Sequence, residues 1–279
     1  GMASGTPVVA ARTGGLADIV EHGKTGLLVA PGVHDELADA LVTLLEDAKL
    51  RGTLGAAGRK RAAEVFNWQR VAALTGESYA RAVQEPMAGA ARPVSTPLRK
   101  KRDAAKRPRV LFDCQQLTQE TTGIGRYSEQ VLKALLKGDA GLDWALLCSS
   151  ANLDYVRGLF GEGDGVRYVV IEKGASPDWR AQRRLLSSVI PAEGMDLYFS
   201  PAFLSVPAKL CPSIAVIHDT TYVSLPKDLF PKNFPEYMHA CVTETCRHAS
   251  RVVTVSENSR RDIAEIYGYP AERIDVTPL

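Results

Sequence analysis

The sequence from residue 109 onward alternates short apolar runs with longer amphipathic stretches, and this alternation constrains the fold more than any other feature. The apolar runs have the length and composition of buried strands, and they span residues 109–113, 144–148, 166–171, 196–200, 213–217, 251–256 and 273–277. The stretches between them place apolar residues at helical spacing. Strands that alternate with helices predict a parallel, doubly wound, Rossmann-like α/β sheet.

The first 86 residues predict part of a second α/β unit. Strands are expected at residues 7–10 and 26–32, and helical stretches at 16–23, 35–47 and 66–83. The helix at 35–47 opens on acidic residues, as the helix dipole favours, and gathers four leucines on one face. More helix is expected after it, interrupted by glycines at positions 52, 55 and 58.

Residues 87–108 separate these two parts and have the composition of a linker. They lack a hydrophobic period and contain prolines at positions 93, 97 and 108. The whole chain has a net charge of only +2, yet residues 92–109 hold eight basic residues against one aspartate, a net charge of +7. We therefore divide the chain into residues 1–86, a basic linker at 87–108, and residues 109–279.

Composition excludes several classes of protein. No apolar run reaches the roughly 18–20 residues that cross a bilayer, so we expect a cytoplasmic protein. The five cysteines form no CxxC pair and no zinc-finger spacing with histidine, and we predict free thiols and no metal site. Aromatic residues do not interleave the basic stretch, which argues against nucleic acid as a partner. An anionic membrane surface at the inner face of the membrane remains an alternative to a plain solvated linker.

Ligands of a doubly wound sheet bind beyond the carboxyl ends of its strands, and this rule selects a few positions. The first strand after the linker ends at Asp113, and its loop leads to the sequence GIGRY at 123–127, just before a helix. Glycines there allow backbone N–H groups to approach an anion at a helix N-terminus, and Arg126 adds a cation. A plain tight turn is the alternative interpretation.

Two later strands also end in polar residues. His218 and Asp219 follow the strand at 213–217, where the histidine faces a cleft or is satisfied by nearby backbone. Asp219 either orients the imidazole or begins a loop. The strand at 251–256 ends at Ser256, with Asn258 shortly after it, and these residues serve either as helix N-caps or as donors to a ligand phosphate.

As an ordered set, these motifs resemble a known family of enzymes. Residues 109–279 resemble the N-terminal, acceptor-binding domain of retaining nucleotide-sugar glycosyltransferases with the GT-B fold, in their mannosyltransferase-like branch. The resemblance rests on the segments TGIGRYSEQVLKALL at 122–136, IHDTTYVSLP at 217–226 and RVVTVSENSRRDI at 251–263. Residues 1–86 resemble the last part of the donor-binding domain of the same family, most strongly over residues 2–32.

The resemblance implies an enzyme that transfers a sugar, with mannose as one candidate, from a nucleotide diphosphate sugar to a hydroxyl with retention of configuration. The expected setting is cell-surface polysaccharide or glycolipid synthesis, the partners are the nucleotide sugar and a glycan or lipid-linked acceptor, and no metal or other cofactor is expected. His218 would act beside the transferred sugar, and Asp219 would hold its ring. The implied substrate-binding residues are Gly14, Gly15, Gly123, Ile124, Gly125, Arg126, Ser256 and Asn258.

The order of the two parts carries a further expectation. The family places its acceptor domain first, whereas here the donor-like part precedes the acceptor-like part. The E-x7-E glutamate pair that precedes residues 2–32 in the family is not in the sequence, and Asp18 stands where glutamate is more usual. We expect a segment across the junction of two fused transferases that transfers no sugar alone. The alternative function is a non-catalytic nucleotide-sugar or glycan-binding module with a membrane-tethering basic linker.

Overall fold

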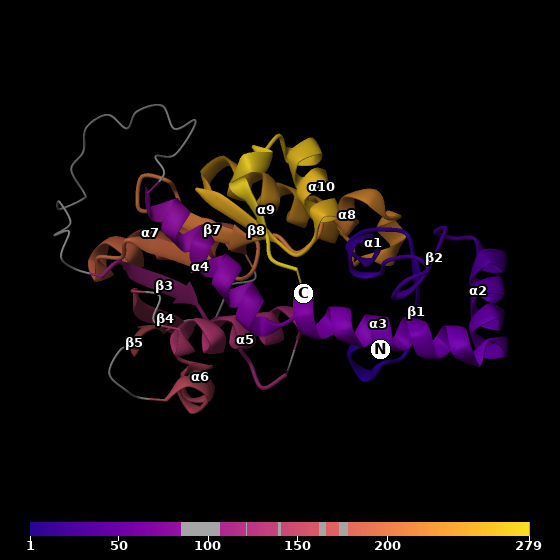
Figure 1. The fold of residues 1–279 in the computed structure, drawn as a ribbon. Helices are drawn as coiled ribbons and strands as arrows, with labels where there is room; N and C mark the ends of the chain where they lie inside the picture. The colour runs from indigo at the N-terminus through magenta and orange to yellow at the C-terminus, as the bar shows by residue number, and fades with distance from the viewer. Residues whose placement is uncertain (85–106, 121, 139–140, 162–165, 173–177, 279) are drawn as a thin grey trace.

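A computed structural model describes residues 1–84, 107–120, 122–138, 141–161, 166–172 and 178–278 (Figure 1). The linker and most of the basic stretch, residues 85–106, lie outside the described residues, so the membrane interpretation of that stretch stays a prediction. Across the described ranges, none of the helices is long and apolar enough to cross a membrane.

Residues 107–278 build one parallel sheet of seven described strands, which confirms the predicted α/β class. The strands are β3 (Arg109–Asp113), β4 (Asp143–Ser149), β5 (Val166–Ile171), β6 (Leu197–Ser200), β7 (Ser213–Val216), β8 (Arg251–Thr254) and β9 (Ile274–Val276). Their order across the sheet is β5-β4-β3-β6-β7-β8-β9, and every pairing is parallel. The order reverses between β3 and β6, which is the crevice where such sheets bind ligands.

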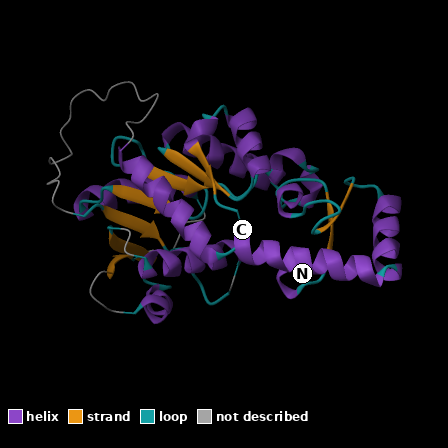
Figure 2. Ribbon diagram, in the orientation of Figure 1, coloured by secondary structure: helices purple, strands orange, loops and turns teal. Residues whose placement is uncertain are grey.

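Helices cover both faces of this sheet (Figure 2). They are α5 (Gly123–Lys137), α6 (Leu153–Phe160), α7 (Trp179–Glu193), α8 (Thr221–Ser224), α9 (Phe234–His248) and α10 (Glu257–Tyr267), with short 3₁₀ turns η2 (Lys227–Leu229) and η3 (Ala271–Arg273). Alternate residues of β3 face opposite sides, because Phe112 packs with α5 while Leu111 packs with Leu186 of α7. The sheet is therefore buried on both faces, which explains its continuous apolar strands.

The N-terminal part forms a smaller unit. Its elements are η1 (Met2–Ser4), β1 (Val8–Ala11), α1 (Leu16–Ile19), β2 (Gly26–Val29), α2 (His34–Glu46), α3 (Ala48–Val65) and α4 (Trp68–Gln84). β1 and β2 pair in parallel as a separate two-stranded sheet. We call residues 1–66 the N-terminal region, and residues 67–84 with 107–278 the sheet domain, for the following reason.

Helix α4 packs into the core of the seven-stranded sheet. It contacts α5 and strands β6 to β9, and it crosses the sheet in Figure 1. Tyr79 and Ala82 are fully buried, and the Tyr79 ring meets Phe199 edge-on, with ring centroids 5.1 Å apart. Asn67 precedes the helix, and its side chain accepts a hydrogen bond from the N–H of Arg70 at 2.9 Å. The expected last helix of the first part therefore docks on the domain that follows the linker.

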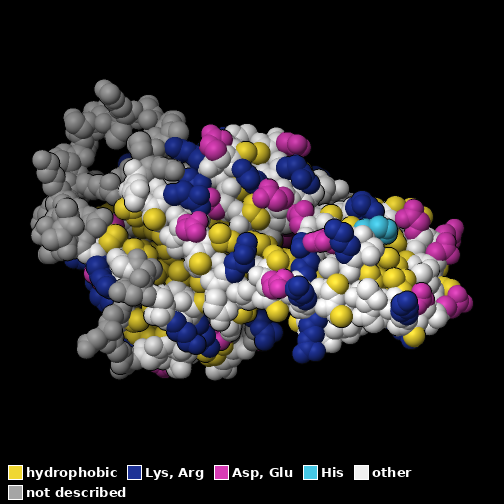
Figure 3. All heavy atoms as spheres, in the orientation of Figure 1, with side chains coloured by type: hydrophobic (Ala, Val, Ile, Leu, Met, Phe, Trp, Pro, Cys, Tyr) yellow, Lys and Arg dark blue, Asp and Glu magenta, His cyan; other side chains and the backbone are white. Residues whose placement is uncertain are grey.

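One expectation for the N-terminal region was wrong in detail. The glycines do not interrupt α3, which runs unbroken from residue 48 to 65. Gly55 is needed for packing, since a Cβ there would lie 2.0 Å from the carbonyl oxygen of Gly5. Of the four leucines on α2, only Leu44 is buried; the three others are exposed, and Leu45 is 75% exposed. Figure 3 shows hydrophobic side chains on the surface beside acidic ones at this end of the molecule.

Candidate active site

The loop after β3 leads into α5 as predicted, and α5 begins at Gly123. Thr122 is its N-cap, and the Thr122 hydroxyl accepts a hydrogen bond from the N–H of Gly125 at 3.0 Å. Gly125 is buried, and a Cβ there would come within 3.2 Å of the carbonyl oxygen of Gln116. Gly123 faces open space, and the Arg126 side chain is exposed. The first turn of α5 thus presents N–H groups and one cation at the carboxyl edge of the sheet.

His218 follows β7 at the same edge and is surrounded by three segments. Its ring meets the Tyr127 ring of α5 edge-on, with centroids 5.0 Å apart, and Phe203 lies on another side. Its Nε2 lies 3.0 Å from the carbonyl oxygen of Pro201. Because a carbonyl only accepts, Nε2 carries the hydrogen, and Nδ1 is the unprotonated nitrogen of the neutral ring.

The electrostatic environment keeps this imidazole neutral. Burial lowers the pKa of His218 from its ordinary value, and the bond to Pro201 and the charge of Asp219 offset only part of that effect. At neutral pH the ring is therefore uncharged, with a lone pair on Nδ1 that is able to accept a hydrogen bond.

Asp219 does not hold the His218 ring as we expected. Its carboxylate instead accepts hydrogen bonds from the N–H of Thr221 at 3.0 Å and from the Thr221 hydroxyl at 2.6 Å. Asp219 is exposed and begins the turn into the short helix α8. The physical reason is local. An aspartate side chain readily accepts a hydrogen bond from the backbone N–H two residues ahead, and this bond competes with a bond to the ring of the neighbouring His218.

Ser256 and Asn258 lie at the N-terminus of α10. Ser256 is buried, and its hydroxyl accepts a hydrogen bond from the N–H of Ser259 at 3.0 Å, so it is the N-cap. The Ser259 hydroxyl in turn donates to the carbonyl oxygen of His218 at 3.2 Å. Asn258 uses its side-chain amide to bind Asp262 at 3.0 Å. Both predicted residues have structural roles here, and it is Ser259 that connects α10 to His218.

Gly14 and Gly15 of the N-terminal region also lie at the N-terminus of α10. A Cβ on Gly15 would lie 3.2 Å from Cβ of Ser256, so the Gly14–Gly15 turn rests directly on the start of α10. Gly14 has a φ of 51°, which glycine adopts at no steric cost. Asp18, three residues later, accepts a hydrogen bond from the backbone N–H of Asn258 at 3.0 Å. A carboxylate from the N-terminal region thus caps a helix of the sheet domain.

Asp113 occupies the crevice between β3 and β6, and the choice of site residues missed it. Its buried carboxylate accepts hydrogen bonds from the Tyr198 hydroxyl at 2.7 Å and from the N–H of Gln115 at 3.0 Å. Burial raises the pKa of Asp113, while those hydrogen bonds act in the opposite direction. Its position at the end of the first strand was the available signal. In the described part of the chain, no group of three or more potential ligands is placed to hold a metal ion.

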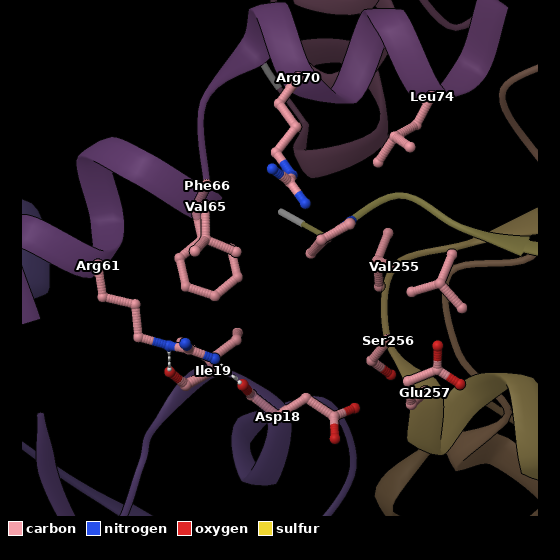
Figure 4. A pocket seen from close by; sticks show the side chains of 12 residues that line it. Asp18, Ile19, Arg61, Val65, Phe66, Arg70, Leu74, Val255, Ser256 and Glu257 are labelled. Atoms are coloured by element: carbon pink, nitrogen blue, oxygen red, sulfur yellow. Dashed lines mark hydrogen bonds between the residues drawn. The ribbon is translucent and has the colours of Figure 1, made fainter. Parts of the chain in front are cut away.

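A pocket of about 310 Å³ opens between the N-terminal region and the sheet domain (Figure 4). It is lined by Asp18, Ile19, Arg61, Val65, Phe66, Arg70, Leu74, Val255, Ser256, Glu257, Val276 and Pro278. Ser256 was predicted as a site residue, whereas the two arginines were not. Those arginines lie on helices whose sequence pattern gave no sign of a ligand, and only the packing of the two parts brings them here.

Arg61 fixes one wall of this pocket. Its guanidinium donates to the carbonyl oxygens of Ile19 at 3.0 Å and of Asp18 at 2.8 Å, and it pairs with Glu21 at 2.5 Å. These carbonyls belong to the last turn of α1, where a cation is favoured. Arg61 therefore holds α1 in the orientation that presents the Asp18 carboxylate to α10.

Two family models match the chain. Residues 1–61 match the model described as glycosyl transferases group 1. Residues 121–279, more than half of the chain, match the model described as glycosyltransferase family 4.

Curated relatives match over shorter stretches. An MMP alpha-(1->4)-mannosyltransferase of Mycolicibacterium hassiacum is 47% identical over 83 residues, which cover 29% of this chain and 20% of that protein. A D-inositol 3-phosphate glycosyltransferase of an Arthrobacter species is 47% identical over 83 residues, 30% of this chain and 20% of that protein. A GDP-mannose-dependent alpha-(1-6)-phosphatidylinositol monomannoside mannosyltransferase of Mycobacterium tuberculosis is 41% identical over 71 residues, 25% of this chain and 18% of that protein.

The chain spans about a fifth of the length of these curated relatives. Among solved structures, it resembles Arabidopsis thaliana UGT89C1 complexed with UDP-L-rhamnose, with a TM-score of 0.37 and 14% identity over 61% of this chain and 51% of that one. The match to the family model over more than half of the sequence shows that the chain belongs to glycosyltransferase family 4.

Proposed function

We propose that the sheet domain is the acceptor-side half of a retaining glycosyltransferase, which moves a sugar from a nucleotide diphosphate sugar to a hydroxyl. One observation carries the proposal: α5 and α10 both meet His218 at the carboxyl edge of the sheet. Tyr127 of α5 packs against the His218 ring, and Ser259 of α10 binds its carbonyl oxygen. A reaction site at this edge is what a doubly wound sheet supports.

The state of His218 suits a position beside the transferred sugar. Positive charge develops on the sugar ring during transfer, and a protonated imidazole would oppose it. Burial keeps the ring neutral at neutral pH, and Nδ1 is the nitrogen able to accept a hydrogen bond from a sugar hydroxyl. With its Nε2–H donated to Pro201, the ring has a fixed orientation.

The first turn of α5 is the proposed contact for phosphate or acceptor groups. Charge develops on the leaving diphosphate, and prearranged N–H groups and cations lower the barrier when they face it. Gly123 and Ile124 lie in this turn, Gly125 allows the close approach of the preceding loop, and Arg126 supplies an exposed cation. The contribution of Ser256 and Asn258 is the positioning of α10, since their polar groups bind protein atoms.

The names of the relatives support a choice of sugar and acceptor. Two are mannosyltransferases, and one of these is GDP-mannose-dependent and named for a phosphatidylinositol mannoside acceptor. A third is named for inositol 3-phosphate. We therefore place mannose first among donor sugars and a polyol or glycolipid hydroxyl first among acceptors, in a cell-surface polysaccharide or glycolipid route.

The test is a turnover assay with GDP-mannose on the protein extended to include a complete donor-binding domain. Replacing His218 by alanine should lower the rate on the order of a hundredfold with nucleotide-sugar binding retained. His34→Ala, an exposed histidine of the N-terminal region, is the matched control and should leave the rate unchanged. Nucleotide-sugar binding without turnover in the unmutated protein would contradict the proposal and favour a non-catalytic binding module. Robust turnover by the 279-residue chain alone would contradict its assignment as one half of the enzyme.

A further inference from the structure

The Tyr127 ring is the closest aromatic neighbour of His218 in the described part of the chain. The two ring centroids lie 5.0 Å apart with the planes nearly perpendicular, at 89°, whereas Phe203 lies 6.0 Å from the imidazole. Tyr127 is only 2% exposed, so its ring keeps water from the side of the imidazole that it covers. The neutral state of His218, which burial produces, therefore depends on where the Tyr127 ring lies.

Tyr127 is held in turn by α4. The ring of Trp68, the first residue of α4, meets the Tyr127 ring edge-on with centroids 6.4 Å apart. One side of α4 also brings Thr75 near the Tyr127 hydroxyl, where Thr75 and Thr277 partly offset the burial that raises the pKa of Tyr127 to about 12. Helices α4 and α5 pack against each other along this contact (Figure 1). Tyr127 thus connects α4 to His218.

The far end of α4 is anchored without the help of Trp68. Tyr79 is fully buried in the sheet core, and Nη2 of Arg81 lies 2.9 Å from Oδ1 of Asp275. Asp275 also pairs with the buried Arg251, whose Nε lies 2.7 Å from Oδ2 of Asp275. A change at Trp68 should therefore disturb the first turn of α4 and leave the rest of the helix docked.

Close packing explains how a change at Trp68 reaches His218. A buried ring that has a neighbour on each contact has little room to turn, so the Tyr127 ring keeps its place while both neighbours are present. Removal of the Trp68 ring opens a space, and the Tyr127 ring gains room to move away from the imidazole. Water then reaches His218, and burial no longer penalises its charged form.

We propose that Trp68 and Tyr127 are positioning residues for His218. Trp68 fixes the Tyr127 ring, and Tyr127 holds the imidazole in place and shields it from water. The effect on sugar transfer rests on the function proposed above, because a displaced imidazole no longer meets the transferred sugar in the right geometry. Helix α4 precedes the basic linker in the sequence, so a segment far from His218 in the chain determines the environment of its ring.

The first test measures the state of His218 in the 279-residue chain by NMR titration of its imidazole, with the signal assigned from its absence in His218→Asn. Trp68→Ala and Tyr127→Ala should both raise the pKa of His218 toward the ordinary value of about 6.5. Trp68→Phe keeps a ring at the contact and should restore most of the original pKa. Tyr127→Phe keeps both ring contacts and should leave the pKa of His218 unchanged.

Trp179→Ala is the matched control for Trp68→Ala. Trp179 is also half-buried and is also the first residue of its helix, α7. Its ring lies under the guanidinium of Arg180, 4.4 Å away, and packs on the other face of the sheet, so the pKa of His218 should not change. Thermal melting of both variants measures the general loss of stability. An equal rise of the His218 pKa in both would contradict the proposal, because it would reflect general loosening.

The second test is the turnover assay on the protein extended to include a complete donor-binding domain. Trp68→Ala should lower kcat about tenfold and leave KM for the nucleotide sugar unchanged, because a displaced His218 affects transfer and not donor binding. Trp68→Phe should recover most of kcat. A raised pKa of His218 with unchanged kcat would overturn the role of Trp68 in transfer.

Two NMR results would overturn the proposal outright: an unchanged pKa of His218 in Trp68→Ala, or the same pKa in Trp68→Phe as in Trp68→Ala. These results are separable from the proposed function, since the titration needs no sugar transfer. If His218→Ala leaves turnover unchanged, the role of His218 in transfer fails, and the titration still decides whether α4 controls its ring.

Discussion

The N-terminal region and the sheet domain follow the same α/β plan with very different amounts of core. The buried cluster around β1 and β2 holds four residues: Met2, Ala10, Val20 and Leu28. Among its described residues, the sheet domain has three larger clusters on the two faces of its sheet. Burial of apolar surface is the main stabilising contribution to folding. The N-terminal region therefore depends for its stability on contacts with the sheet domain, whereas the sheet domain is stabilised by its own core.

The largest expected effect lies in α4, which decides where the boundary between the two falls. Tyr79→Ala should lower the free energy of unfolding by about 3–5 kcal/mol, because it removes a fully buried ring from the sheet core. Tyr79→Phe should be close to neutral, since no described group binds the Tyr79 hydroxyl. Urea unfolding of both variants, with the exposed Glu77→Ala as control, measures this. A small loss in Tyr79→Ala would show that the sheet domain does not depend on α4.

A second substitution tests the core of the N-terminal region alone. Leu54 is the most deeply buried leucine of α3, and Leu54→Ala should cost about 2–3 kcal/mol. We expect the loss to appear as faster hydrogen exchange in β1, β2 and α3, with exchange in β3 to β9 unchanged. Leu45→Ala, at an exposed position of α2, is the control. Faster exchange throughout the sheet domain would mean that the two parts unfold as one.

The contact between the two parts gives a smaller effect. Asp18→Ala removes the carboxylate that caps α10 and should cost about 1 kcal/mol. Hydrogen exchange at Asn258 and cleavage by protease between the N-terminal region and α4 should both become faster. Asp39→Ala, an exposed aspartate of α2, is expected to change neither. Unaltered exchange at Asn258 would refute the assignment of Asp18 as the cap.

The smallest effect is a pH dependence that belongs to the sheet domain. Burial lowers the pKa of His218, so the unfolded chain binds its proton first as the pH falls. The stabilising contribution is complete above the unfolded value of about 6.5 and is lost as the pH falls through the folded value. As the pH falls from about 7.5 to about 5.5, the unmutated chain should lose more of its free energy of unfolding than His218→Asn does. His248, whose pKa burial also lowers, is present in both chains and cancels. Equal losses would show that the His218 ring is accessible to water.

The strands of the sheet domain could be predicted because a sheet buried on both faces reads as continuous apolar runs. The run at 166–171 coincides with β5 residue for residue. The continuous path of α3 could not be predicted, because glycine propensity suggests a break while the close approach of η1 requires Gly55. Local propensity was overridden there by packing between distant segments.

The same limit applied at the candidate site. The positions of His218 and the first turn of α5 follow from the rule on strand ends, and the structure brings them together through Tyr127. The bond between Asp18 and Asn258 joins residues 240 positions apart, and no local pattern indicates it. The place of Arg70 in the pocket could not be predicted for the same reason, since its neighbours across the pocket come from both parts of the chain.

The break between α3 and α4 has a mechanical consequence. The two helices meet at Phe66 and Asn67, and the pocket takes Arg61 and Val65 from one helix and Arg70 and Leu74 from the other. The angle between α3 and α4 therefore sets the width of the pocket. Any ligand that prefers one width also favours one bend, so occupancy of the pocket and the pose of the N-terminal region are thermodynamically linked.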